Sequence, residues 1–447
     1  MDNEKENQAM PTDDGNIDND INLDNEKSNN PDKKQSRAVR IINDYKLKRE
    51  IKAADTDVIF SEPVSAQPEE APKPLHKGSI DMWFFIWAAM LVCFGAVMSY
   101  SASAVYAEMR YGSSTYFLVR YIAFTAAAII PTALAVIFVR PWQWRIFGAV
   151  SYVACFPLLI WVILAGDTGG GAQRWIELGP ITIQPSEIAK MAIVMVLAIY
   201  MSKYEKEANS RHKFGGGFKH GFFVPMILIG ALCALIIIQP HLSGTIIVGM
   251  IGLVMMFLGG THPKWLLIFL GIIAVAGGIF LLFFGYSVER VEIWLHIDEV
   301  DPLGQAWQTL QGLYAIGSGG FFGVGLGGSR QKFGYVSQPQ NDFVFTIICE
   351  ELGFVGAFFV IFLFCMLIWR GIKIGQRAPD KFSALVIWGL TFKIALQVLL
   401  NIAVVTNSMP NTGISLPFFS SGGTSLMLQI FEIGIILSLS RFSSQKQ

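Results

Sequence analysis

The chain has 447 residues, of which 53% are hydrophobic and only 15% are charged, and its formal net charge is zero. This composition, with a mean hydropathy of +0.47, excludes an ordinary soluble domain. The apolar residues come in runs long enough for helices to cross the roughly 30 Å hydrocarbon core of a bilayer, whereas β-barrel strands are short and alternate in polarity. The sequence therefore predicts an all-α polytopic membrane protein.

Residues 1–79 differ from the rest of the chain because they are rich in Asp, Asn, Glu, Lys and Pro. Such a segment is too polar to bury a core and is predicted to be a disordered tail. Within it, residues 36–49 could form a basic amphipathic helix on anionic lipid or on a partner. No signal peptide precedes the first apolar run, so the tail is expected in the cytoplasm.

From Asp81 onward the hydropathy pattern predicts ten membrane spans. They cover approximately residues 82–102, 116–139, 145–165, 186–202, 221–239, 243–260, 265–285, 343–369, 383–406 and 423–440. Lys and Arg gather in alternate loops, and the positive-inside rule then places both termini in the cytoplasm and Asp342 on the other side. We expect one membrane domain over residues 80–441 and a short cytoplasmic end at 442–447.

A polar stretch opens the fourth span. Ser186 is expected to cap this helix because Pro185 interrupts the preceding chain, and Glu187 suits the positive end of the helix dipole. Lys190 is one turn further on and can pair with Glu187 by i, i+3 spacing. The alternative is that Lys190 and Arg174 present their cations to an anionic head group outside the bilayer.

The loop at 286–342 is the longest between predicted spans. Loops of this length are usually functional or disordered, and the Trp, Phe and Leu content favours a folded element at the membrane surface. Its glycine-rich runs at 317–320 and 323–328 lack the context of a nucleotide-binding fingerprint. We expect these glycines to allow sharp turns or close approach to another segment.

Three carboxylates mark the start of the eighth span. Asp342 lies at its lip, and Glu350 and Glu351 lie about two turns inside it. An ionisable group at membrane depth costs roughly 3 kcal/mol on insertion scales and by default indicates function. This is the strongest candidate for chemistry in the chain.

The ninth span carries Lys393, Gln397 and Asn401 at steps of four, which places them on one helix face. With Glu432 in the tenth span, Glu187 and Lys190 in the fourth, and the pair Glu350 and Glu351, they form a polar set that faces the bundle interior. An internal network that joins helices is favoured over a proton or ion path, because relay-type His or Asp residues are missing from these spans.

A Pro- and Gly-rich segment at 410–425 precedes the last span. Non-helical backbone near membrane depth persists only where it is buried in protein or lines a wet cavity. We therefore expect this segment to border the same outer cavity as Asp342.

These motifs, in this order, resemble the SEDS family of cell-shape and division proteins, the FtsW, RodA and SpoVE group. The resemblance covers roughly residues 80–441, and the stretch 325–332 is more similar to FtsW than to RodA. Three positions depart from the family pattern: His241 stands where Asp is common, and Lys393 and Glu432 stand where uncharged residues are expected. The matching stretches are 171–176, 184–187 with Lys190, 239–240, 317–320, 341–345, 350–353, 412–413, 416–418 and 421–423.

The resemblance implies a SEDS-type fold and a peptidoglycan glycosyltransferase of the bacterial cytoplasmic membrane. Such an enzyme polymerises lipid II on the outer membrane face, with a class B penicillin-binding protein and other divisome proteins as partners and no nucleic acid. The family's catalytic acid corresponds to Asp342. Inverting transfer from a polyprenyl diphosphate sugar needs only one general base, because the diphosphate is already a good leaving group.

Other residues are assigned supporting roles around Asp342. The diphosphate charge is expected to be offset by Arg174, Lys332, Arg120 and Arg330. The cavity is expected to be ordered by Gln184, Ser186, Glu187, Lys190, Glu350, Glu351, Ser421 and Gly422. No metal site is expected, and a divalent cation on the diphosphate stays open because no dedicated ligand set is evident.

Three alternatives remain at this point. A transporter of lipid-linked precursors also suits many spans with internal charges, although the acid lies at the outer lip and no internal repeat is evident. A scaffold that only docks a transpeptidase would tolerate replacement of its outer polar residues. An elongation role of the RodA type is the alternative to a role in division.

Overall fold

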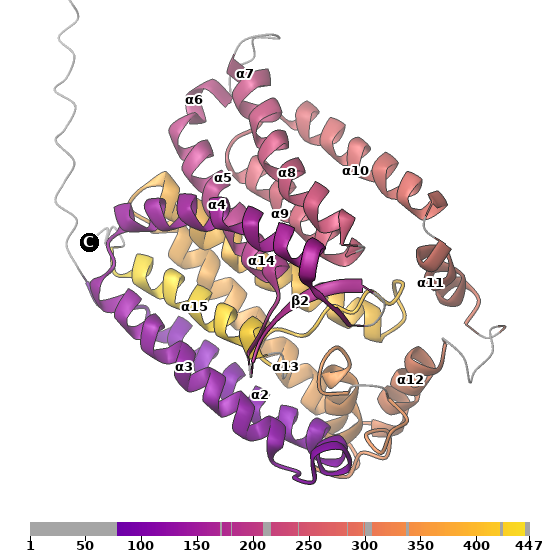
Figure 1. Ribbon diagram of the computed structural model, residues 1–447. Helices are drawn as coiled ribbons and strands as arrows, with labels where there is room; N and C mark the ends of the chain where they lie inside the picture. The colour runs from indigo at the N-terminus through magenta and orange to yellow at the C-terminus, as the bar shows by residue number, and fades with distance from the viewer. Residues whose placement is uncertain are drawn as a thin grey trace, which may run out of the picture. The chain divides into compact units, whose positions relative to one another are not determined.

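The computed structural model describes residues 78–442, apart from short gaps at 170–171, 180, 209–215, 240, 284, 298, 300–305, 337–338 and 421–422. The predicted tail and the C-terminal end therefore lie almost wholly outside the described residues, as do Ser421 and Gly422. What is described is mainly helical (Figure 1).

Eight helices in the described part of the chain are long and apolar enough to cross a membrane. They are α2 (Met82–Tyr111), α3 (Tyr116–Phe138), α4 (Pro141–Ala165), α5 (Pro185–Lys203), η1 with α8 (Lys219–Phe223 and Val224–Ile238), α13 (Val344–Gln376), α14 (Lys381–Val405) and α15 (Gly423–Ser440). Two further apolar helices are α9 (Leu242–Leu258) and α10 (Pro263–Phe283). Each of the ten predicted spans overlaps one of these helices.

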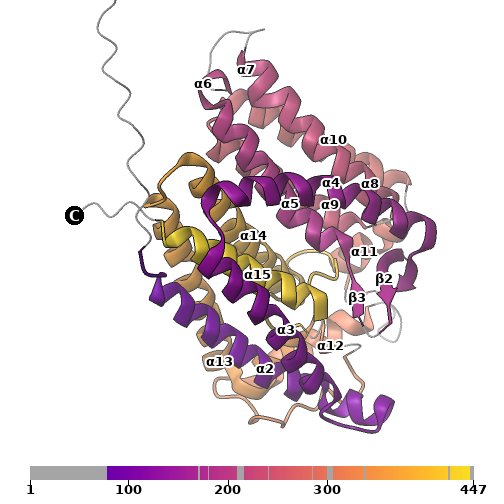
Figure 2. The same cartoon turned by 60° about the vertical axis from the view of Figure 1, so that its left-hand side comes forward.

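Three helices form the centre of the bundle. Of the apolar stretch of each span, 72% is buried in α5 and in α14 and 83% in α15, compared with 22–39% in the other five. In Figure 2, α15 lies between α3 and α14, and it packs on both. The surrounding helices expose apolar side chains such as Ile130, Trp161 and Phe358, as expected for surfaces that face lipid. Polar residues on the three central helices are therefore shielded by protein.

The described part of the loop at 286–342 includes two helices. It contains α11 (Gly285–Leu295) and α12 (Trp307–Gly319), and two short helices elsewhere are α6 (Glu205–Ala208) and α7 (Gly216–Phe218). Helix α12 packs on α13.

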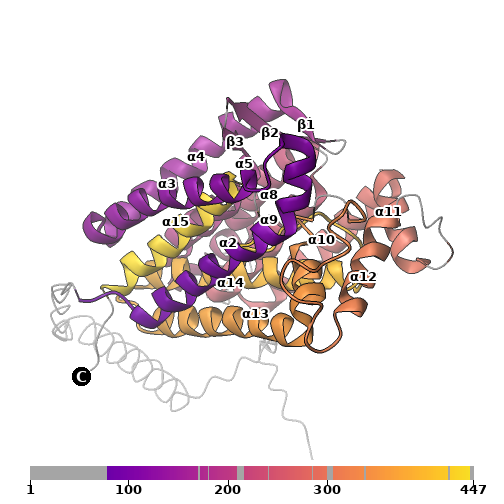
Figure 3. The same cartoon turned by 90° about the horizontal axis from the view of Figure 1, so that it is seen from below.

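A small antiparallel sheet, which the sequence analysis did not predict, joins α4 to α5. Its strands β1 (Asp167–Gly169), β2 (Ala172–Leu178) and β3 (Ile181–Ile183) pair in that order, with Ile176 opposite Ile183. Gly179 has φ +64°, a left-handed conformation that glycine adopts readily, and turns β2 into β3. Figure 3 shows the sheet, α11 and α12 near the same end of the helices.

Helix α13 is interrupted at Gly353, which has φ 66° and ψ −162°. The interruption leaves backbone N–H and C=O groups of α13 without partners inside the helix. The glycine-rich loop forms hydrogen bonds with these groups. The N–H groups of Val324 and Gly325 donate to the carbonyls of Glu350 and Glu351, both at 3.0 Å, and Phe354 donates back to Gly320. The loop thus replaces part of the helical hydrogen bonding, which keeps buried backbone groups paired.

Two glycines of the loop lie so close to the backbone of α13 that no residue with a Cβ atom would fit at either position. A Cβ at Gly319 would lie 1.9 Å from the carbonyl oxygen of Cys349, and one at Gly323 would lie 2.2 Å from that of Glu351. The prediction that these glycines allow close approach to another segment is confirmed.

Gly319→Ala should therefore destabilise the protein by about 1–3 kcal/mol, the usual cost of overpacking. Gly317→Ala is the matched control, since a Cβ there meets nothing within 4 Å and alanine is the better helix former. Thermal unfolding of the purified protein in detergent measures both. Equal melting temperatures for the two variants would contradict the close packing.

Candidate active site

Asp342 lies just before α13, which begins at Val344. Its position is fixed by Asn401 of α14, whose Nδ2 donates to the backbone oxygen of Asp342 at 2.8 Å and to that of Ile414 at 2.7 Å. Gly413, at φ +65°, lies so close that a Cβ there would be 3.3 Å from Oδ2 of Asp342. The predicted placement of Asp342 at the lip of a helix, bordered by the segment before α15, is confirmed.

Two arginines act on the Asp342 carboxylate from different elements, Arg174 from β2 and Arg290 from α11. Removal from water is the larger influence and raises the pKa of Asp342 from its usual 3.8 to about 6, while the two guanidinium groups pull the pKa down. A carboxyl group with a pKa near 6 is mostly deprotonated at neutral pH. The resulting carboxylate can accept a proton, as a general base must.

Arg290 was not among the predicted site residues. Its Nη1 donates to the backbone oxygen of Asn411 at 2.7 Å, and Trp294, one turn later on α11, donates its Nε1–H to the backbone oxygen of Asn407 at 3.0 Å. These two bonds fasten α11 to the segment that follows α14. The only sequence signal was the charged, amphiphilic pattern around Arg290.

His241 lies between α8 and α9 and is 7% exposed. Burial, and then the charges of Arg174 and Lys190, lower the pKa of His241 to about 3, against the opposing influence of Glu187. The imidazole is therefore neutral at physiological pH.

The predicted polar set in the bundle interior contains two buried ion pairs. Lys190 and Glu187 of α5 lie 2.5 Å apart, which confirms the i, i+3 pair and keeps Lys190 inside the protein. Lys393 of α14 and Glu432 of α15 also lie 2.5 Å apart, and both are fully buried. The two unexpected charges are thus partners, and their ion pair links α14 to α15, as an internal network between helices would require. The proton or ion path stays the competing hypothesis.

The expected cap at Ser186 is wrong. Helix α5 begins at Pro185 with Gln184 as its N-cap residue, and no side chain caps it. The Ser186 hydroxyl is buried and has no hydrogen-bond partner in the part of the chain that the structure describes. Proline at the first helical position needs no capping partner for an N–H group, because it has none.

Glu350 and Glu351 hold the glycine-rich loop. Glu350 accepts from Oγ of Ser329 at 2.5 Å, and Glu351 accepts from Oγ of Ser101 at 2.6 Å. Lys332 pairs with Glu351 at 3.0 Å and is 5% exposed. Glu350 and Lys332 therefore connect the loop to α13, and Glu351 also connects α13 to α2.

The four predicted diphosphate contacts differ in their surroundings. Arg174 acts on Asp342, whereas Lys332 is engaged by Glu351. The guanidinium of Arg120 lies 5.5 Å from the ring centre of Phe124. Arg330 is exposed and binds Glu350 through its backbone N–H. Among the described residues, no group of three or more His, Cys, Asp and Glu could hold a metal ion.

Comparison with known proteins identifies relatives over nearly all of the described chain. Residues 81–445 match a family of FtsW, RodA and SpoVE proteins described as cell cycle proteins. Stage V sporulation protein E of Bacillus subtilis (strain 168) is 39% identical over 371 residues, covering 82% of this chain and 98% of that protein. A probable peptidoglycan glycosyltransferase FtsW of Geobacter sp. (strain M18) is 32% identical over 363 residues, covering 80% and 96%.

Several solved structures share the fold, and two of them are described here. One belongs to a peptidoglycan synthase complex that coordinates polymerization and crosslinking; it has a TM-score of 0.66 and 27% identity and covers 82% of this chain and 99% of that chain. The other is the rod shape determining protein RodA of Thermus thermophilus, with a TM-score of 0.60, 25% identity, and coverage of 82% and 98%. The predicted family resemblance and fold are confirmed.

Proposed function

Because this chain belongs to the family of cell cycle proteins FtsW, RodA and SpoVE, we propose that it is a peptidoglycan glycosyltransferase that polymerises lipid II, with Asp342 as general base. The relatives named as probable glycosyltransferases support the class of reaction. The observation that carries the mechanism is the Asp342 carboxylate, held near its helix and acted on by two arginines.

In this mechanism the acceptor sugar attacks the anomeric carbon of the donor. Asp342 takes the proton from the attacking hydroxyl as the new C–O bond forms, and the bond to the diphosphate breaks with inversion. The positive charges of Arg174 and Arg290 act on this carboxylate and would also offset the charge of the departing diphosphate. Asp342 then releases its proton to solvent.

The setting of the reaction is also part of the proposal. We place the protein in the bacterial cytoplasmic membrane, with both termini in the cytoplasm and Asp342 at the outer face, as the positive-inside rule predicts. The structural likeness to a synthase complex that couples polymerization with crosslinking supports a class B penicillin-binding protein as partner. The FtsW relatives favour a role in division, and the sporulation relative makes a role in spore formation the alternative.

The direct test is polymerisation of lipid II by the purified protein with its cognate transpeptidase in liposomes. Glycan polymer is the expected product. Movement of labelled lipid II between leaflets without polymer would favour the transporter instead.

The rate of polymerisation should depend on pH through the titration of Asp342 alone. With the pKa of Asp342 at about 6, kcat/KM should rise about tenfold per pH unit below pH 6 and level off above it. His241 should add no second limb, because its pKa of about 3 keeps it neutral throughout this range. Initial rates at constant ionic strength measure the profile, and a flat profile between about pH 5 and 8 would contradict the assignment of the base.

A further inference from the structure

The glycine-rich loop that follows α12 exposes four large apolar side chains within six residues. They are Phe321, Phe322, Val324 and Leu326, which we call the apolar loop surface. Phe322 is 79% exposed and Leu326 is 62% exposed. Exposed apolar patches mark places where a protein contacts another protein or a membrane. The apolar loop surface therefore calls for an occupant.

The apolar loop surface is continuous with the outer surface of α13. The ring of Phe321 stacks on that of Phe354 with centroids 5.7 Å apart, and Phe354 stacks on Phe358 at 6.3 Å. Phe322 packs edge-on against Phe321 at 4.9 Å. Phe354 and Phe358 are exposed on the apolar span α13, as expected for a surface that faces lipid. A row of four rings thus leads from the lipid-facing surface of α13 onto the loop.

The backbone of the loop is suited to an environment with little water. Backbone N–H and C=O groups at membrane depth need partners within the protein, and several groups of this loop have them. The bonds run from Gly323 N to Gly319 O at 2.8 Å, Val324 N to Glu350 O at 3.0 Å, Gly325 N to Glu351 O at 3.0 Å and Val355 N to Phe321 O at 3.2 Å. These bonds also hold the apolar loop surface firmly on α13.

The charges of the loop suit the head-group level of a bilayer. Between residues 319 and 341 the sequence has two cations, Arg330 and Lys332, and no carboxylate. Arg330 is exposed, and a guanidinium group pairs well with phosphate. Lipid-exposed irregular backbone does not occur in the hydrocarbon region, whereas interfacial elements bury an apolar face about 5–10 Å into the boundary between head groups and acyl chains. The loop has the properties of such an interfacial element.

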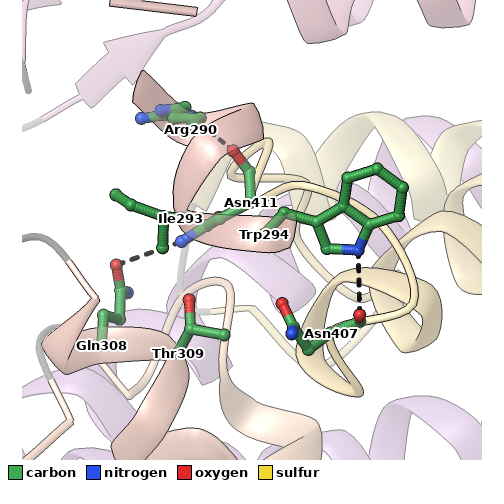
Figure 4. Close-up of a pocket in the computed structure, with 7 residues that line it drawn as sticks. All are labelled: Arg290, Ile293, Trp294, Gln308, Thr309, Asn407 and Asn411. Carbon is green, nitrogen blue, oxygen red and sulfur yellow. Dashed lines mark hydrogen bonds between the residues drawn. The ribbon is translucent and has the colours of Figure 1, made fainter. Parts of the chain in front are cut away.

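The polar surface near the proposed active site is separate from this loop. A pocket of about 260 Å³ lies between α11, the start of α12 and the segment after α14 (Figure 4). Its lining includes Arg290, Gln308, Asn407 and Asn411, so the pocket is mainly polar. It borders the first turn of α12, and the apolar loop surface begins only after the end of this helix, about 15 Å further along its axis. The two surfaces therefore have different occupants.

We propose that the apolar loop surface binds membrane phospholipid, at the head-group level of the leaflet on the side of Asp342. Lipid is a better occupant than a partner protein or a second copy of this chain, because the same row of rings already faces lipid on α13. The bound loop anchors the start of α13, and with it Asp342, at a fixed depth in the membrane. This interaction goes beyond the proposed function and does not depend on it.

The test is photocrosslinking from single positions of the loop. Phe322→p-benzoylphenylalanine and Leu326→p-benzoylphenylalanine are made separately, reconstituted in liposomes of phosphatidylethanolamine and phosphatidylglycerol, irradiated and analysed by mass spectrometry. Both should gain the mass of one phospholipid, in yields comparable with the same substitution at Phe358. The same substitution at Glu292, an exposed residue of α11, is the aqueous control and should give no phospholipid adduct.

The experiment is then repeated with the cognate transpeptidase present. Phospholipid adducts that persist at both loop positions support the inference. Adducts to the transpeptidase or to a second copy of the chain in place of lipid would overturn it, as would yields no higher than at Glu292 in either experiment. Lipid II is not used, so the result is independent of polymerisation.

A second measurement reports the surroundings of Phe322 without a chemical reaction. The nitrile stretching frequency of p-cyanophenylalanine differs between water and an apolar environment. In the same liposomes the frequency at Phe322 should match that at Phe358 and differ from that at Glu292. Because all three side chains are exposed, the substitutions should leave the melting temperature unchanged. A frequency at Phe322 equal to that at Glu292 would show that the loop lies in water.

Discussion

Asp342→Asn should remove polymerase activity almost completely. A general base typically contributes about 10²–10⁴-fold to the rate, and asparagine cannot accept the proton from the attacking hydroxyl. The change keeps the size of the side chain and leaves the backbone bond to Asn401 in place, because that bond uses the main-chain oxygen of Asp342. Polymer yield from lipid II in liposomes, at equal protein and partner concentration, measures the loss.

Loss of folding cannot explain the expected effect. A carboxyl group whose pKa rises from 3.8 to about 6 on folding stabilises the folded state relatively less as pH increases between these values. Above pH 6 the asparagine variant should therefore unfold at the same temperature as the wild type or higher. Glu292→Gln is the matched control, since Glu292 is an exposed carboxylate on α11 that should be replaceable without loss.

The outcome also separates the alternatives. Wild-type rates from Asp342→Asn would show that the base is elsewhere. A scaffold would tolerate this substitution together with changes to the other outer polar residues, and a transporter would retain lipid movement. Only an enzyme that uses Asp342 loses polymerisation while it keeps its fold and its partner.

The sequence sufficed for features that depend on local spacing. Runs of about 20 apolar residues are needed to cross a bilayer, and all ten predicted segments are helical. The pairing of Glu187 with Lys190 follows from their positions on one helix. The placement of Asp342 follows from its position next to an apolar run.

Features that depend on contacts between distant segments could not be predicted. Arg174 is placed by a sheet of two three-residue strands and one of seven, too short to give a clear periodic signal. Arg290 reaches the site because α11 is fastened to the segment after α14. The glycine-rich loop was expected to approach another segment, but its partner, the interruption of α13 at Gly353, is a property of the folded chain.

Lys393 and Glu432 show a partial limit, since they were predicted to share one internal polar network but their positions in the sequence do not show that they pair with each other. Together they form an ion pair with both side chains fully buried. A buried pair offsets much of its desolvation cost, whereas removing one partner leaves an uncompensated charge. The pair is therefore expected to be required as a unit.

Lys393→Met should destabilise the protein by about 3–5 kcal/mol, and Glu432→Gln should also be destabilising, because each leaves the other charge unpaired. The double variant should recover most of the loss, since replacing both members of a buried pair is often nearly neutral. Thermal unfolding of the wild type, both single variants and the double variant gives the coupling directly. Additive losses would contradict the pairing.

Activity of the double variant then decides what the network does. If the charges only join α14 to α15, a double variant that folds normally should polymerise lipid II at close to the wild-type rate. A double variant that folds normally and makes no polymer would instead favour the proton or ion path, because its helices would still be joined by packing while the titratable groups would be gone.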